Sequence, residues 1–238
     1  MAGNMSDSNE CQRPRFTAGG VWRGSVEIAP VAAFVVPFGI AFGVAASATG
    51  ISPEISIFMS VAIYAGASQF AVLDLWYAPL PLATLALTVL AVNARHILLG
   101  AALAPWLLQV PIARRLPALL LLSDSSFAHA ISARDRGERD AGILLGSGLT
   151  IWIMWIVSSA IGALAGSLLG DLSRFGFDAV MVAYLTAVIV GQWKGRSDPF
   201  PLIAAAAVAV AGRHVLPPGW HIIAGALAGG IVGVWRHG

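Results

Sequence analysis

Long apolar runs separated by short breaks of proline, glycine and charged residues are the feature that most constrains this chain. The chain is 58% hydrophobic and only 11% charged, whereas soluble domains carry about 25% charged residues. A soluble fold of this length could not bury so much apolar surface in one core. The sequence therefore predicts an all-α, polytopic integral membrane helical bundle. We expect apolar runs at about 26–49, 55–77, 82–108, 118–133, 141–169, 178–193, 200–216 and 219–235.

The number of spans depends on the short run at 118–133. A bilayer core of roughly 30 Å needs about 20 apolar residues per helix, so this run is tilted, broken or re-entrant. We therefore predict about seven or eight spans, some of them broken or kinked. The polar stretches at 110–115 and 134–140 are interpreted as loops.

The distribution of basic residues predicts the orientation. With eight spans, most basic loop residues, such as Arg15 and Arg134, fall on the side of both termini, whereas Arg114 falls opposite; this favours cytoplasmic termini in an inner membrane. Residues 1–25 lack the apolar core of a signal peptide and are interpreted as a cytoplasmic tail, followed by one transmembrane transport domain at 26–238.

The composition argues against several classes of function. The single Cys11 allows no internal disulfide and no thiolate metal cluster. No Walker loop or HExxH motif is present, and the nearly balanced charges give no basic surface for nucleic acid. We therefore expect no metal, no cofactor and no catalytic site.

Two charged residues inside apolar runs are the strongest candidates for a solute site, because charges within membrane spans are costly and usually functional. Arg95 lies near the middle of the run 82–108 and is too deep to reach the lipid headgroups easily. Asp124, in the run 118–133, is its expected counter-charge. A purely structural ion pair between two helices remains the alternative.

Neutral polar and helix-breaking residues accompany these two charges. Proline removes a backbone hydrogen bond and kinks a helix, and broken membrane helices form solute sites in transporters. Glycine allows a helix to unwind or another backbone to approach. Tight packing alone also explains the small residues. The remaining candidate site residues are Asn93, His96, Ser68, Gln69, Gly66, Gly39 and Pro37.

Four segments in order resemble the AzlC family of branched-chain amino acid permeases. They are PFGIAFG at 37–43, YAGASQF at 64–70, NARH at 93–96 and SDSSF at 123–127. The resemblance covers nearly the whole chain after residue 25. Ser125 departs from it, because an acidic residue often follows the aspartate in the family. The resemblance implies an exporter of valine, leucine or isoleucine that acts with a small AzlD-type membrane subunit.

A branched-chain amino acid is a zwitterion, which suggests how such a site works. Arg95 would bind the carboxylate and Asp124 the ammonium group, and a proton on Asp124 or His96 would provide coupling. Two other functions remain open. Asp124, Ser126 and His129 suggest an intramembrane hydrolase, although no nucleophile elbow surrounds these serines. A channel is the other, although no carbonyl filter or charged ring is apparent.

Overall fold

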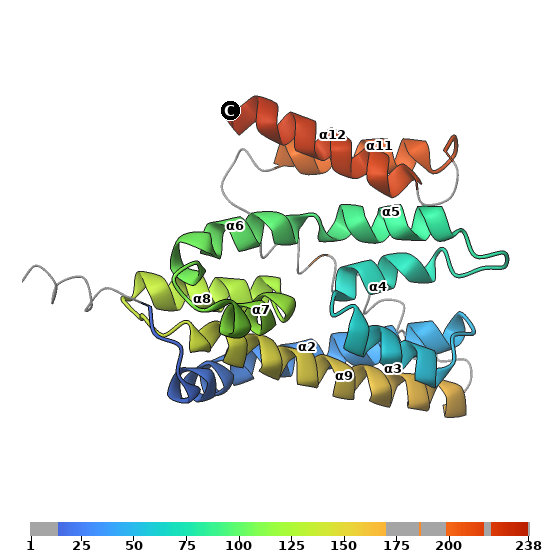
Figure 1. Cartoon of the computed structure of the whole chain (residues 1–238). Coiled ribbons are helices and arrows are strands. Elements are labelled where there is room, and N and C mark those ends of the chain that lie inside the picture. The colour runs from blue at the N-terminus through green and yellow to red at the C-terminus, as the bar shows by residue number, and fades with distance from the viewer. Residues whose placement is uncertain (1–13, 170–185, 187–198, 217–219, 238) are drawn as a thin grey trace, which may run out of the picture. The chain divides into compact units, whose positions relative to one another are not determined.

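The computed structural model describes residues 14–169, 186, 199–216 and 220–237, and the described elements are helices (Figure 1). The expected run at 178–193 and most of the expected tail lie outside these residues. The chain divides into two compact units, 1–39 with 95–158 (unit 1) and 40–94 with 159–238 (unit 2). The helices are α2 (Ala18–Ala48), α3 (Pro53–Ala62), α4 (Gly66–Leu73), α5 (Leu82–Asn93), α6 (Arg95–Leu107), α7 (Ile112–Leu120), α8 (Asp124–Asp135), α9 (Gly142–Leu169), α11 (Pro199–Gly212) and α12 (Trp220–His237).

Three stretches of the described chain are helical, long and apolar enough to cross a bilayer. They are Ala18–Ala48, Leu82–Leu107 and Gly142–Gly166. Shorter apolar helices cover Pro53–Ala62, Pro199–Gly212 and Ile223–Arg236. The second stretch is interrupted at Ala94, between α5 and α6. The all-α membrane fold expected from the sequence is therefore present, with breaks inside the apolar runs.

The run expected at 55–77 is two short helices and not one span. The helix α3 has 10 residues and α4 has 8, each well below the roughly 20 residues that a span needs. The break lies at 63–65, where Tyr64 has a positive φ of 41°, and α4 begins at Gly66. Helix unwinding was expected beside Gly66, and this is where the structure places it.

The run expected at 118–133 is also a broken pair, α7 and α8, in unit 1. Its two ends lie at the same end of that unit. Arg114 in α7 donates to the Phe16 carbonyl at 3.2 Å, and Arg15, next to Phe16, pairs through its backbone with Arg139 and Ala141 just after α8. The pair therefore returns to the end from which it started, as a re-entrant pair does.

This geometry corrects two predictions. The stretch 110–115 was expected to be a loop, yet Arg114 and Arg115 lie inside α7, which starts at Ile112 after Pro111. Arg114 was also placed on the side opposite to Arg15, whereas it contacts the neighbouring Phe16. The side of Arg114 depends on the number of spans between it and Arg15, and the run at 55–77, which was counted as one span, is two short helices. A cluster of buried apolar residues holds α6, α7 and α8 together in unit 1, and it includes Leu103, Leu107, Ala118, Leu122 and Ala130.

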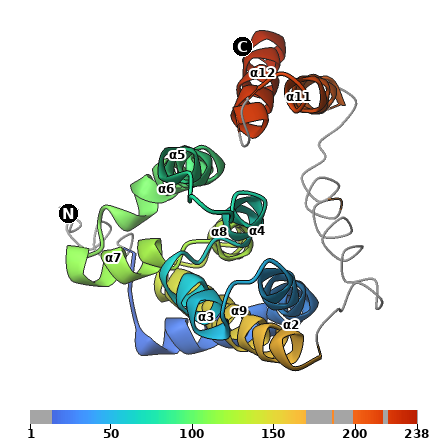
Figure 2. The ribbon, with the colours of Figure 1, turned by 90° about the vertical axis from the view of Figure 1, so that its right-hand side faces the viewer.

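Glycine allows close helix packing within each unit. In unit 2, a methyl group on Gly162 would lie 2.1 Å from the Ile40 carbonyl oxygen of α2. In unit 1, a methyl group on Gly146 would lie 1.9 Å from the Val21 carbonyl oxygen, also in α2. Glycine is thus required where α9 meets α2 within each unit. The helices α11 and α12 lie side by side in unit 2 (Figure 2).

Candidate functional site

An ion pair lies at the break between α5 and α6. Arg95 is the first residue of α6, and its Nη1 lies 2.8 Å from Oδ2 of Asp124, the first residue of α8. The two side chains are 32% and 48% exposed, so the pair is accessible and not sealed within a core. Both residues belong to unit 1. The ion pair expected from the sequence is therefore present.

The start of α8 explains why Asp124 occupies this place. Ser123 caps the helix and forms a capping box with Ser126, in which each side chain bonds the backbone N–H of the other at 3.2 and 2.8 Å. A carboxylate in the first turn is stabilised by the positive end of the helix dipole. Asp124 therefore occupies a favourable position at a helix end that is already capped.

Arg95 is less completely satisfied than its partner. A cation in the first turn of α6 is disfavoured by the helix dipole. Its Nε is buried and has no hydrogen-bond partner among the described residues. A buried donor without a partner costs about 1–3 kcal/mol. Arg95 therefore retains one unused donor beside an accessible ion pair.

A second polar cluster lies in unit 2 and carries no charge. The Ser60 hydroxyl receives a hydrogen bond from Gln69 Nε2 at 3.3 Å and lies 2.8 Å from the Ser159 hydroxyl. All three side chains are fully buried. This neutral cluster connects α3, α4 and α9 within unit 2.

Asn93 extends the polar character of unit 2 to the end of α5. Its Nδ2 donates to the Ser68 hydroxyl at 3.2 Å, and Ser68 donates to the Ala65 carbonyl at 2.8 Å. Ala65 belongs to the break between α3 and α4. The hydrogen bonds therefore fix the start of α4 against the end of α5.

The other predicted site residues are in helices, and their roles stay predictions. His96 is the second residue of α6. Gly66 is the first residue of α4. Pro37 and Gly39 lie inside α2, which continues through both positions. Within the part of the chain that is described, no group of three or more His, Cys, Asp or Glu residues could hold a metal.

The hydrolase arrangement is not assembled. Ser126 bonds with Ser123 in the capping box, and its hydroxyl donates to the Ser123 carbonyl at 3.1 Å. His129 instead contacts Ser147 and Glu27. Ser126 and His129 therefore have different partners, because the cap turns Ser126 towards the helix start.

Glu27 was missed as a site residue. It lies in the third turn of α2, and its Oε2 is 3.0 Å from His129 Nε2. The contact could not be predicted from local patterns, because the two positions are 102 residues apart in the chain. The presence of a carboxylate and an imidazole in two separate apolar runs was the signal that could have suggested this pair.

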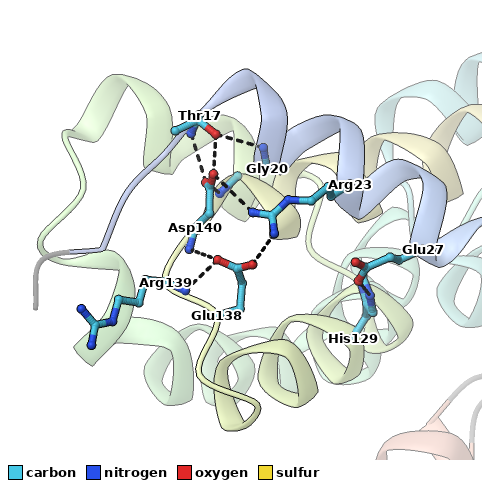
Figure 3. A network of polar contacts seen from close by, with 9 residues as sticks. Thr17, Gly20, Arg23, Glu27, His129, Glu138, Arg139 and Asp140 are labelled. Carbon is cyan, nitrogen blue, oxygen red and sulfur yellow. Dashed lines mark hydrogen bonds and ion pairs between the residues drawn. The ribbon is translucent and has the colours of Figure 1, made fainter. Parts of the chain in front are cut away.

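A further network lies at the end of unit 1 that holds the start of α2 (Figure 3). Asp140 accepts hydrogen bonds from the backbone and hydroxyl of Thr17 and from the Gly142 N–H. Arg23 Nη1 lies 2.6 Å from Glu138 Oε2. Burial alone would raise the pKa of Glu138, but the N–H of Asp140 and the Arg23 guanidinium hold it below its ordinary value. This network fixes α2 to the loop before α9.

Comparisons with known proteins agree with the membrane fold. The model of the AzlC protein family matches residues 30–169. An inner membrane protein of Escherichia coli, YgaZ, is 34% identical over 60% of this chain and 60% of its own length. A membrane protein of Archaeoglobus fulgidus is 30% identical over 90% and 94% of the two chains. The branched-chain amino acid transport protein AzlC of Bacillus subtilis is 27% identical over 86% and 80%. No solved structure matches the chain significantly.

Proposed function

Because this chain belongs to the AzlC family, we propose that it is a permease that exports branched-chain amino acids and binds them at Arg95 and Asp124. The observation that carries the proposal is the accessible ion pair between these residues at the break between α5 and α6. A relative, AzlC of Bacillus subtilis, is described as a branched-chain amino acid transport protein. This supports the substrate class, and the site supports the means of binding.

The two charges suit the two ends of a zwitterion. A guanidinium binds a carboxylate in a two-point, planar arrangement, and Arg95 Nε has no partner among the described residues. The substrate carboxylate would use Nε together with a terminal nitrogen. Its ammonium group would then bind Asp124, which is 48% exposed.

This exchange of partners limits the cost of binding. Taking a charge out of water is expensive unless it gains a partner. A zwitterion inserted between Arg95 and Asp124 replaces one ion pair by two. An amine or a carboxylic acid alone would leave one protein charge without a partner, which explains a preference for amino acids.

The remaining candidates supply the neutral surroundings. Asn93, Ser68 and Gln69 are hydrogen-bonding groups without charge, and we propose that they line the route of the solute. Gly66, Gly39 and Pro37 would leave room for an aliphatic side chain. The small AzlD-type subunit is part of the same proposal, and so are the export direction and the inner-membrane location.

Amino acid efflux from preloaded cells tests the proposal. Arg95→Ala and Asp124→Asn are each expected to abolish efflux while the protein still inserts. Asp135→Asn on the same helix α8, whose side chain is 65% exposed, and Arg139→Ala serve as matched controls and should leave efflux unchanged. This chain and the neighbouring small membrane subunit should also be expressed separately and together. Efflux is expected only when both are present. Unchanged efflux in either site variant would remove that residue from the mechanism.

A further inference from the structure

A second group of polar side chains in unit 1 is separate from the Arg95–Asp124 pair. His129 of α8 lies between Glu27 of α2 and Ser147 of α9, and the Glu27–His129 contact is visible in Figure 3. Its Nε2 is 3.0 Å from Glu27 Oε2, and its Nδ1 is 2.7 Å from Ser147 Oγ. Both ring nitrogens therefore have a partner, and each contact requires one proton between its two atoms.

One proton arrangement satisfies every contact with an imidazolium ring. The Ser147 hydroxyl donates to the Ile143 carbonyl at 2.8 Å, so it accepts a hydrogen bond from Nδ1–H of His129. The other nitrogen, Nε2–H, donates to the Glu27 carboxylate. The ring carries two protons, and its positive charge offsets the carboxylate, so the group is neutral overall.

A second arrangement uses the same heavy-atom positions with one proton fewer. The Ser147 hydroxyl rotates and donates to Nδ1 of His129, while Nε2–H continues to donate to Glu27. The ring is then neutral, and the group carries one negative charge. The hydroxyl then gives up its contacts with the Ile143 carbonyl at 2.8 Å and with the Gly24 carbonyl at 3.4 Å. A hydroxyl can reverse its direction in this way because it both donates and accepts.

We propose that Glu27, His129 and Ser147 form the proton-binding site that couples transport to a proton gradient. The inference rests on the proposed function and adds to it the site of coupling. One proton taken from water binds to the imidazole ring, and no covalent bond between heavy atoms forms or breaks. Histidine is suited to this task because it changes charge near neutral pH.

Water has a way to reach this site. Glu27 lines a cavity of about 330 Å³ together with Ala133, Arg136, Glu138 and Ile143. Its side chain is 45% exposed, whereas that of His129 is only 13% exposed. Ser147 is fully buried. The group thus runs from an exposed carboxylate to a buried hydroxyl, so protons would enter at Glu27.

The charges around the site are mixed in sign. Arg136 and Glu138 line the same cavity as Glu27, and Arg23, one turn before Glu27, interacts electrostatically with Glu27 and binds Glu138. Asp124 is on the same helix as His129 and is paired with Arg95. The helix α9 carries no charged residue between Gly142 and Ser158. This part of α9 therefore adds no charge of its own to those of Glu27 and His129.

The helix α8 connects the proton site to the substrate site. Asp124 and His129 are five residues apart, about 7.5 Å along the helix axis and on different faces. Gaining or losing a proton at His129 changes the attraction between α8 and α2. Because α8 also carries Asp124, the same change acts on the Arg95–Asp124 pair. A hydrolase with Ser147 as nucleophile does not fit, because the buried Ser147 leaves no room for a substrate.

Transport by purified wild type and variants in liposomes, with the partner subunit if it is required, tests the inference. Exchange of labelled for unlabelled leucine without a gradient measures the permease itself, and leucine movement driven by an imposed pH gradient measures coupling. Glu27→Gln and His129→Gln are expected to retain exchange and to lose the gradient-driven acceleration, roughly a tenfold effect for a typical coupling energy. Ser147→Ala removes one buried oxygen and should weaken the gradient-driven acceleration. This variant serves as the substitute if either of the other two inserts poorly.

The outcomes separate the inference from the function on which it rests. A wild type without exchange overturns both. Wild-type exchange combined with a normal gradient response in Glu27→Gln and His129→Gln overturns the inference alone. The same holds if these variants lose exchange as well, or if His96→Gln alone abolishes the gradient response.

Discussion

The two broken helix pairs differ in the polar groups that they present. In unit 1, the pair α7–α8 carries Asp124 and His129, and both contact ionisable partners. In unit 2, the pair α3–α4 carries Ser60 and Gln69, which join a fully buried neutral cluster. Each unit therefore contains two half-helices in place of one span. They carry charged side chains in unit 1 and neutral hydrogen-bonding side chains in unit 2.

The difference indicates a division of roles. An accessible ion pair can exchange partners with a zwitterion, whereas a buried neutral cluster that satisfies itself mainly fixes a backbone break. We therefore expect changes in the charged pair to affect transport more than changes in the neutral cluster.

Exchange of the two charges should have the largest effect. In Arg95→Asp combined with Asp124→Arg, the ion pair can form again with reversed polarity, so the protein is expected to insert. Efflux should stay at least about 100-fold below wild type, because a substrate in its wild-type orientation would meet a like charge at each end, which costs several kcal/mol. Recovery of efflux in the double variant would show that the pair is only structural.

Loss of the neutral cluster should have a smaller effect. Gln69→Leu removes the donor to Ser60 and leaves a buried hydroxyl less well satisfied, which costs about 1–3 kcal/mol. We expect efflux at saturating substrate to fall by about tenfold or less, together with a lower melting temperature. A loss as complete as that of Arg95→Ala would break the comparison between the two units.

Close packing of α2 on α9 should be equally sensitive in both units. Gly146→Ala in unit 1 and Gly162→Ala in unit 2 each place a methyl group against a carbonyl oxygen of α2 and should destabilise by about 1–3 kcal/mol. Gly100→Ala in α6 is the control, because nothing lies within 4 Å of the added methyl. It should be neutral or stabilising by up to about 1 kcal/mol. Thermal unfolding in detergent measures all three.

The smallest effect concerns the network at the end of unit 1. The pKa of Glu138 is lowered on folding from its ordinary value of 4.5. Its ionised form therefore stabilises the folded protein at pH values above 4.5. That contribution is lost as the pH falls through the lower, folded value. We expect Glu138→Gln to lower the melting temperature slightly at pH 7 and to flatten its decline below about pH 5. An unchanged acid profile would contradict this.

The sequence predicted the charged pair because Arg95 and Asp124 are costly in apolar runs and each needs a counter-charge. It also indicated the break beside Gly66. It did not predict the break at Ala94, where neither glycine nor proline interrupts the helix. Arg114 was assigned to the wrong side because the run at 55–77, which is two half-helices, has the length of one span. The contact of Glu27 with His129 arises from tertiary packing, which local patterns do not encode.

Binding by Arg95 and Asp124 of the two ends of one substrate is the central claim. The most direct test is the affinity of purified wild type and Asp124→Asn for leucine and for 4-methylpentanoate, which lacks the ammonium group. We predict that Asp124→Asn weakens leucine binding by at least about tenfold, the size expected for one charge-assisted contact. The weak binding of 4-methylpentanoate should not be weakened further. An equal loss for both ligands, or no loss for leucine, would contradict the account.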